Sequence, residues 1–202
     1  MQIIKTNFSF CSPLTKRTKT EYIVLHHRSG CGNAASIHAA HLANGWAGIG
    51  YHLYIRKDGS VFEGRPLYAV GAHAVGFNQT SVGVCFEGNF ENEKMSALQL
   101  KKGSEVILYL MKQFPAAKVV RHRDLCATAC PGRNFPFDSI KKGAEQTNGA
   151  GGAKKLESAN DITWELKQKI EIQDTDGFVA ALDRAKKENS PLYWGYYKLV
   201  NK

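Results

Sequence analysis

Apolar residues gather along the chain in short runs and in longer segments with helical spacing. Three short runs rich in β-branched or other apolar residues predict buried strands, at residues 22–26 (YIVLH), 81–88 (SVGVCFEG) and 118–122 (KVVRH). Each run is too short for a helix of typical length, and turn-forming or polar residues bound it. These segments therefore predict the strands of a sheet core.

A hairpin is predicted where two strand-like runs flank Asp58-Gly59, a dipeptide typical of tight turns. Polar and apolar positions alternate in residues 51–56, ahead of this turn. The alternation predicts one set of side chains on one face of the strand: Tyr51, Leu53 and Ile55.

Two helices are predicted between the strands. Apolar residues recur at helical spacing from about Ser96 to Phe114, and Pro115 ends this helix. A shorter helix is predicted from about Ala35 to Asn44, with Gly45 as its C-terminal stop. Strands and helices thus alternate, which predicts a single α/β domain.

The composition of the chain changes near residue 147. Residues 1–146 are predicted to form the α/β domain, and residues 147–153 (TNGAGGA) a flexible Gly-rich linker. Residues 154–202 predict a small all-helical C-terminal module. Its aromatic residues are either sugar-stacking groups for cell-wall binding, or the module's own core or a dimer contact: Tyr193, Trp194, Tyr196 and Tyr197.

The charge of the chain is unevenly distributed. The formal net charge is +9, and residues 1–153 hold 18 Lys+Arg and 10 Asp+Glu, a net charge of +8. Such a surface favours an anionic partner, such as nucleic acid, a membrane surface or an anionic cell-wall polymer, or it serves solubility alone. The hydrophobic content of 43% is enough for a core.

No apolar run approaches the ~20 residues of a membrane helix. The N-terminal segment lacks the continuous apolar stretch of a secretory signal, so we expect synthesis in the cytoplasm without a signal peptide. The five cysteines are odd in number and irregularly spaced, which does not indicate a disulfide framework.

Residues 122–132 (HRDLCATACPG) allow three interpretations. HRDL opens a protein-kinase catalytic loop, but Ala129 stands where that loop needs an asparagine, and the kinase interpretation fails. A local structural metal site would use His122, Cys126 and Cys130, although a closed zinc site needs four ligands. Alternatively, Cys126 is simply a small buried hydrophobic residue.

The third interpretation joins residues that are distant in the sequence. His26 ends one predicted strand, His122 ends another, and Cys130 follows in the next loop. A catalytic zinc site typically has three protein ligands and one open position, which this set would provide. With seven histidines and five cysteines in the chain, the residues alone leave other triples open.

Four motifs resemble, in order, those of the zinc-dependent N-acetylmuramoyl-L-alanine amidases. These motifs are IVLHH, GWAGIGYHLYIRKDGSVFEGR, AVGAHAVGFNQTSVGVCFEGNF, and HRD followed by ACPG. The family includes phage lysozyme-type amidases and animal peptidoglycan recognition proteins, and the resemblance covers roughly residues 20–140. It implies a mixed central β-sheet flanked by helices and a bound Zn2+ ion.

The resemblance also implies roles for individual residues. His26, His122 and Cys130 match zinc ligands, and Tyr51 matches a tyrosine beside the metal. The side chain of His27 is expected on the opposite face of its strand. Four residues match the rim of the substrate groove, with a structural role equally open for each: Trp46, Arg65, His73 and Asn78.

Two positions depart from parts of the family. Thr128 stands where phage lysozyme-type members carry a lysine, whereas the recognition proteins have threonine there. Cys85 stands where other members place a glutamate general base. Glu87, two residues along the same predicted strand, is a candidate substitute base or a surface charge at the strand end.

The resemblance implies hydrolysis of the amide between N-acetylmuramic acid and L-alanine in bacterial peptidoglycan, as in a phage endolysin that acts on the wall after release. Peptidoglycan and anionic cell-wall polymers are the expected partners. The competing hypothesis is a non-catalytic peptidoglycan-binding protein on the same fold, which typically lacks the cysteine ligand that Cys130 provides here. A nucleic-acid binder has no support beyond charge, and the sequence does not indicate the oligomeric state.

Overall fold

The predicted strands pair in one five-stranded sheet with the order β3-β2-β4-β1-β5. The computed structural model describes residues 2–149. Along the chain the elements are β1 (Tyr22–His27), α1 (Ala34–Ala43), β2 (Leu53–Ile55), β3 (Val61–Glu63), the 3-10 turn η1 (Asn78–Thr80), β4 (Ser81–Phe86), α2 (Ala97–Gln113), β5 (Lys118–Arg121), the 3-10 turn η2 (His122–Asp124) and α3 (Phe137–Gly149).

The sheet is mixed, as predicted. Strand β1 pairs in parallel with β4 on one side and with β5 on the other, and β2 pairs in parallel with β4. Strand β3 pairs antiparallel with β2 through the hairpin at Asp58-Gly59. Gly59 has a φ of +80°, a left-handed conformation that glycine adopts without strain.

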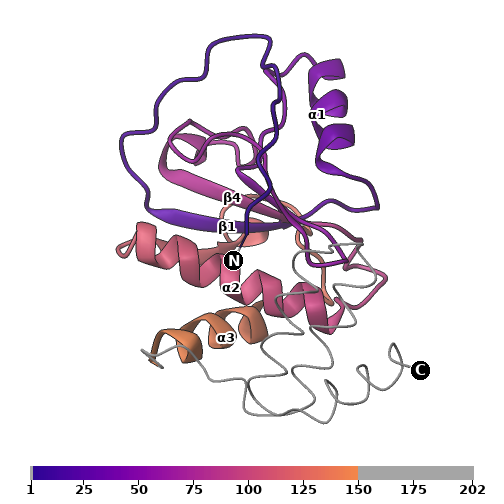
Figure 1. Cartoon of the computed structure of the whole chain (residues 1–202), viewed down its shortest axis with the longest axis vertical. Coiled ribbons are helices and arrows are strands. Elements are labelled where there is room, and N and C mark those ends of the chain that lie inside the picture. The colour runs from indigo at the N-terminus through magenta and orange to yellow at the C-terminus, as the bar shows by residue number, and fades with distance from the viewer. Residues whose placement is uncertain (1, 150–202) are drawn as a thin grey trace, which may run out of the picture. The chain divides into compact units, whose positions relative to one another are not determined.

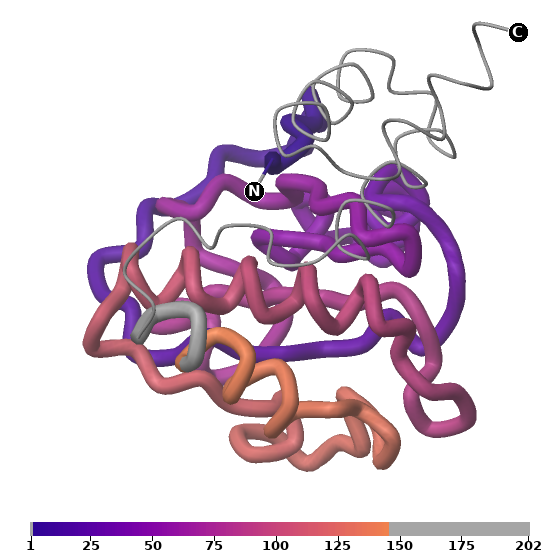
Figure 2. Tube along the Cα trace, turned by 60° about the horizontal axis from the view of Figure 1, so that its bottom comes forward, coloured from indigo at the N-terminus to yellow at the C-terminus, as the bar shows by residue number. Residues whose placement is uncertain are grey.

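Helices cover both faces of the sheet. Helix α1 lies on one side of β1 and β4, while α2 and α3 lie on the other (Figure 1). Helix α3 runs beside α2 (Figure 2). A Cβ atom at Gly143 of α3 would lie 2.5 Å from the Ser104 Oγ of α2, so the absence of a side chain there allows the close approach.

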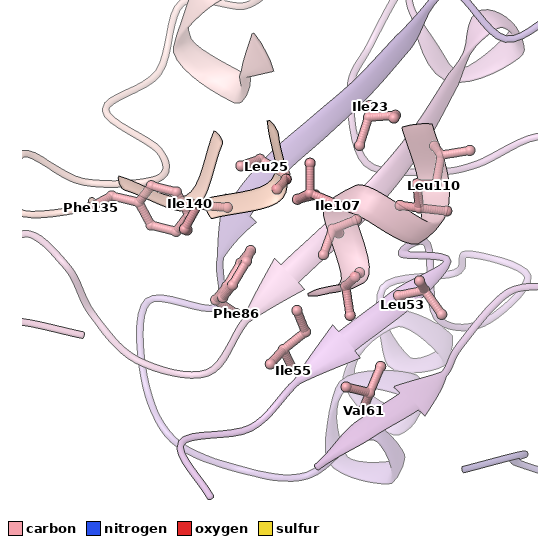
Figure 3. Packing of buried hydrophobic residues seen from close by; sticks show 14 of the residues in the cluster. Ile23, Leu25, Leu53, Ile55, Val61, Phe86, Ile107, Leu110, Phe135 and Ile140 are labelled. Atoms are coloured by element: carbon pink, nitrogen blue, oxygen red, sulfur yellow. The ribbon is translucent and has the colours of Figure 1, made fainter. Parts of the chain in front are cut away.

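The main core lies between the sheet and the helices α2 and α3. Alternate residues of the central strands point into it, and the labelled side chains of α2, Ile107 and Leu110, meet them there (Figure 3). The strand residues of this core include Ile23, Leu25, Leu53, Ile55, Val82, Val84 and Phe86. The alternating residues of the same strands point to the other face, where Tyr54 and Cys85 pack with Ala34 and Ile37 of α1.

The predicted face of Tyr51 was wrong. Tyr51 packs with Ile49, Tyr54 and Cys85, on the face opposite Leu53 and Ile55. Strand β2 begins only at Leu53, so the strict alternation of a strand does not extend back to Tyr51.

Helix α3 was not predicted from the sequence, because its apolar residues are few and Gly143 interrupts them. It extends through Gly149, so residues 147–149 of the predicted linker are helical. The predicted C-terminal module, residues 154–202, lies outside the described residues. Between residues 2 and 149, no helix is long and apolar enough to cross a membrane.

Leu110 and Leu108 of α2 provide a matched test of the core. Leu110 is fully buried against the sheet, whereas Leu108 is only partly buried. We expect Leu110→Ala to lower the free energy of unfolding by about 2–5 kcal/mol, because a cavity forms in a packed core. Leu108→Ala should lower it by less than half as much, as measured by urea denaturation of the full chain. Equal losses would contradict the described core.

Candidate metal centre

Three residues from separate segments meet at one edge of the sheet. His26 is the fifth residue of β1, and His122 comes directly after β5, which pairs in parallel with β1. Because Leu25 and Arg121 are partners in that pairing, His26 and His122 are adjacent, with ring centroids 4.4 Å apart. Parallel pairing thus places two imidazoles at the same strand ends.

Cys130 completes the group from the loop after η2. Its Sγ lies 3.8 Å from the Nδ1 of His26, and one potential ligand atom from each of His26, His122 and Cys130 lies within 4.8 Å of the others. The structure therefore brings together the three residues that the resemblance implied as ligands.

The two imidazoles of this group are neutral at ordinary pH. Burial lowers the pKa of His26 well below its usual value, and the nearby His122 lowers it further. Burial also lowers the pKa of His122. A neutral imidazole has a free lone pair, which a metal ion requires of a ligand.

The loop around Cys130 is held by backbone hydrogen bonds. The His27 N–H donates to the Sγ of Cys130 at 3.4 Å, and the Cys130 N–H donates to the Oγ1 of Thr128 at 3.2 Å. Burial raises the pKa of the Cys130 thiol to about 11, while the bond from His27 lowers it. A bound cation would favour the thiolate instead.

His27 points away from this group, as predicted. Its Nδ1 accepts a hydrogen bond from the Phe90 N–H at 3.1 Å, and its ring stacks on Phe90. The alternation along β1 therefore separates the two adjacent histidines onto opposite faces of the sheet.

Tyr51 lies beside the group. Its ring centroid is 5.1 Å from that of His26. Burial raises the pKa of the Tyr51 phenol well above its usual value, and the thiols of Cys85 and Cys130 raise it further. The phenol therefore keeps its proton and remains a hydrogen-bond donor.

Of the four residues predicted at the groove rim, Trp46 has the most exposed side chain. It is 44% exposed, and its ring lies 4.6 Å from that of His41, which lies 5.7 Å from the ring of Tyr51. The sequence did not indicate His41 as part of this aromatic row. Its helical spacing predicts only a polar position on α1, so no pattern in the sequence identifies it.

The other three predicted rim residues have structural contacts. Arg65 is buried, and its guanidinium donates to the carbonyls of Gly48, Ile49 and Val70. The Oδ1 of Asn78 accepts the N–H groups of His73 and Ala74. His73 itself lies against His26, with its Nδ1 3.0 Å from the Nε2 of His26. Their roles at a groove rim stay predictions.

The carboxylate of Glu87 is buried and engaged away from the metal-site group. Its two oxygens accept the N–H groups of Gly32 and Lys57, each at 3.0 Å. The Nε of Arg56 lies 3.3 Å from one of them. These are the contacts of a structural anchor, and a general-base role for Glu87 stays a prediction.

Cys126 does not belong to the metal-site group found among residues 2–149. Its Sγ points to the carbonyl of Val75 at 3.6 Å. Its side chain is partly exposed, so the alternative prediction of a buried hydrophobic residue was wrong. The local zinc interpretation of residues 122–130 therefore has no support in the geometry. Cys85 is buried.

Comparisons with known proteins agree with this arrangement. A family model described as N-acetylmuramoyl-L-alanine amidase matches residues 16–133. The endolysin of Enterobacteria phage K11 is 37% identical over 131 residues, covering 58% of this chain and 83% of the endolysin. Peptidoglycan-recognition protein SC2 of Drosophila melanogaster is 32% identical over 127 residues, covering 56% and 69% of the two chains.

A solved structure shows the same likeness. The N-acetylmuramoyl-L-alanine amidase LysC from Clostridium intestinale URNW superimposes with a TM-score of 0.69 at 38% sequence identity. The match covers 73% of this chain and 98% of the amidase.

The contacts of Glu87 predict a loss of stability on Glu87→Gln. An amide has one acceptor oxygen, so the N–H of either Gly32 or Lys57 loses its partner. We expect the free energy of unfolding to fall by about 1–3 kcal/mol in urea denaturation. Glu105→Gln, which breaks only an i,i+3 ion pair with Lys102 on α2, should cost no more than about 0.5 kcal/mol.

Peptidoglycan hydrolysis by the same variant separates the two roles of Glu87. If the role of Glu87 is only structural, the folded Glu87→Gln protein should have an activity close to that of the wild type. A loss of about 10²–10⁴-fold without a change in stability would contradict the anchor and assign a general base.

Proposed function

Because the chain belongs to the N-acetylmuramoyl-L-alanine amidase family, we propose that it is a zinc-dependent endolysin. It cleaves peptidoglycan as an amidase, and the bond we assign is the amide between N-acetylmuramic acid and L-alanine. The observation that carries the zinc dependence is the convergence of His26, His122 and Cys130 within 4.8 Å.

The chemistry of the three donors fits zinc. Two neutral imidazoles and one thiolate are ligand types that zinc prefers, and three protein ligands are typical of its catalytic sites. A zinc ion held there would supply a nucleophile from water at neutral pH and polarise the scissile carbonyl. The His27 N–H supports the thiolate by donating to the Sγ of Cys130.

Tyr51 assists the reaction as a hydrogen-bond donor. Hydrolysis of an amide places negative charge on the carbonyl oxygen, and a donor already in place stabilises that charge. The phenol of Tyr51 keeps its proton and lies beside His26, so it is placed to donate to this oxygen. Thr128 carries no charge; its role in the proposal is to orient Cys130, whose N–H it accepts.

The substrate is held by the aromatic row and by charge. Trp46 offers an exposed ring next to His41, on which a sugar ring of the glycan strand stacks. The net charge of +8 on residues 1–153 attracts anionic polymers of the wall. Residues 154–202 lie outside the described part of the chain, and wall targeting is their proposed role. Lysis of the cell follows when the enzyme reaches the wall.

Removal of the metal ligands tests the zinc dependence. On purified peptidoglycan we expect the wild type to release new L-alanine amino groups without new reducing sugar ends. A chelator should abolish this release and added zinc should restore it, because the nucleophile depends on the metal. Cys130→Ala should be inactive, whereas the matched control Cys126→Ala, in the same loop, keeps its activity.

Two results would contradict this assignment. New reducing ends would indicate a glycosidase, and full activity of Cys130→Ala would exclude the zinc site. Binding to peptidoglycan without any release of amino groups would favour the non-catalytic alternative.

The substitution Tyr51→Phe tests whether the Tyr51 hydroxyl donates a hydrogen bond to the reacting carbonyl oxygen. We expect the rate of amide hydrolysis to fall about 10²–10³-fold with zinc binding unchanged, because only the hydroxyl is lost. Tyr54→Phe is the matched control, since the hydroxyl of Tyr54 donates to the Gly32 carbonyl at 2.6 Å and serves the fold alone. That control should retain the wild-type rate, and equal losses in both variants would remove Tyr51 from the mechanism.

A further inference from the structure

His73 contacts the ring nitrogen of His26 that does not face Cys130. The Nδ1 of His26 lies 3.8 Å from the Sγ of Cys130, whereas its Nε2 lies 3.0 Å from the Nδ1 of His73. A neutral imidazole carries one proton, so one ring nitrogen donates and the other offers a lone pair. If His26 donates in the His26–His73 hydrogen bond, its proton is on Nε2, and its Nδ1 offers a free lone pair next to Cys130. If His73 donates, the proton of the neutral His26 ring is on Nδ1 instead.

The partners of His73 decide the direction of that bond. The Nε2 of His73 lies 3.4 Å from the Oγ of Ser81. The Ser81 hydroxyl donates its own proton to the Phe77 carbonyl at 2.7 Å, so its oxygen is left to accept. The Nε2 of His73 accordingly carries the proton, and its Nδ1 is an acceptor.

A directed chain of hydrogen bonds results. The His26 Nε2–H donates to the Nδ1 of His73, the His73 Nε2–H donates to Ser81, and the Ser81 hydroxyl donates to Phe77. In this arrangement the Nδ1 of His26, next to Cys130, has no proton. The chain thus presents a free lone pair to the metal-site group before any metal arrives.

Two glycines leave room for the ring of His73 in this orientation. A Cβ atom at Gly83 of β4 would lie 2.6 Å from the ring, and one at Gly71 would lie 2.5 Å from it. Both distances are too short for real contacts, so the ring occupies space that any side chain would take. The backbone of His73 is held by a hydrogen bond, because its N–H donates to the Oδ1 of Asn78 at 2.7 Å.

We propose that His73 is a positioning residue, which sets the tautomer and ring orientation of His26 and thereby the metal affinity of the site. This inference rests on the proposed zinc site. It replaces a role at the substrate groove rim, because both ring nitrogens of His73 are engaged within the protein. Partners of this kind behind a metal-ligating histidine typically change metal affinity 10–100-fold.

The first test compares zinc affinity among variants of the full chain, by competition with a chromophoric chelator. His73→Phe keeps a ring of similar shape but removes the acceptor, so affinity should fall about 10–100-fold. His73→Asn places an amide oxygen near the position of Nδ1 and should recover most of that loss. His38→Phe is the matched control: His38 is a buried histidine of α1 that bonds Ser9 and Ile49, and it should bind zinc like the wild type.

The second test needs no variant. Nitrogen-15 NMR of the zinc-free wild type reports which ring nitrogen of each histidine carries the proton. We expect the proton on Nε2 in both His26 and His73, and a mixture of His26 tautomers in His73→Phe. A merely structural role of His73 would leave the His26 tautomer unchanged.

The outcomes separate this inference from the proposed function. If the wild type binds no zinc, the proposed zinc site itself is refuted. A wild type that binds zinc, but with the proton of His26 on Nδ1, overturns the role of His73 alone. Wild-type affinity in His73→Phe, or equal losses in His73→Asn and His73→Phe, would overturn it as well.

Discussion

The parallel pairing of β1 with β5 is the constraint on which the site depends. It places the ends of the two strands side by side, so His26 and His122 become neighbours although 96 positions separate them in the sequence. The same pairing orients β1 so that Ile23 and Leu25 point into the core under α2. A shift of one residue in β1 would move His26 into that core and turn the apolar residues toward the site. The core of the protein and the candidate metal centre are therefore fixed by the same register.

Burial gives this site its chemical character. It keeps the imidazoles of His26 and His122 neutral and Tyr51 protonated, so ligands and donor are in the required states at ordinary pH. A backbone group also contributes to the site, because the His27 N–H donates a hydrogen bond to the Sγ of Cys130. The uncharged Thr128 orients the Cys130 loop rather than contributing a cation. In the proposed mechanism, the stabilisation of developing charge thus rests on the metal and on Tyr51.

Local patterns in the sequence predicted the elements that build the site. The apolar runs gave β1, β4 and β5, and Asp58-Gly59 gave the hairpin, because these features depend on near neighbours in the chain. The three candidate ligands could not be identified from local patterns alone. Their positions at or after predicted strand ends made them candidates, and only the order of the four family motifs selected His26, His122 and Cys130 from the other histidines and cysteines.

What the sequence did not predict depends on contacts between distant segments. Tyr51 lies on the other face because β2 starts later than its alternation suggests. The guanidinium of Arg65 donates to loop carbonyls, and the ring of His73 lies against that of His26. The spacing of residues along the sequence does not predict these contacts. Gly71 and Gly83 leave the space that the His73 ring occupies, but this role of the two glycines can be recognised only once the fold is known.

X-ray absorption at the zinc edge on the zinc-loaded full chain tests the proposed centre most directly. We expect one zinc ion per chain, bound by two imidazole nitrogens and one sulfur, and loss of the sulfur in Cys130→Ala. A zinc ion with two sulfur ligands would place Cys126 or another cysteine in the site, and one without sulfur would exclude Cys130. Either result would contradict a centre formed by the ends of β1 and β5 and the loop that follows.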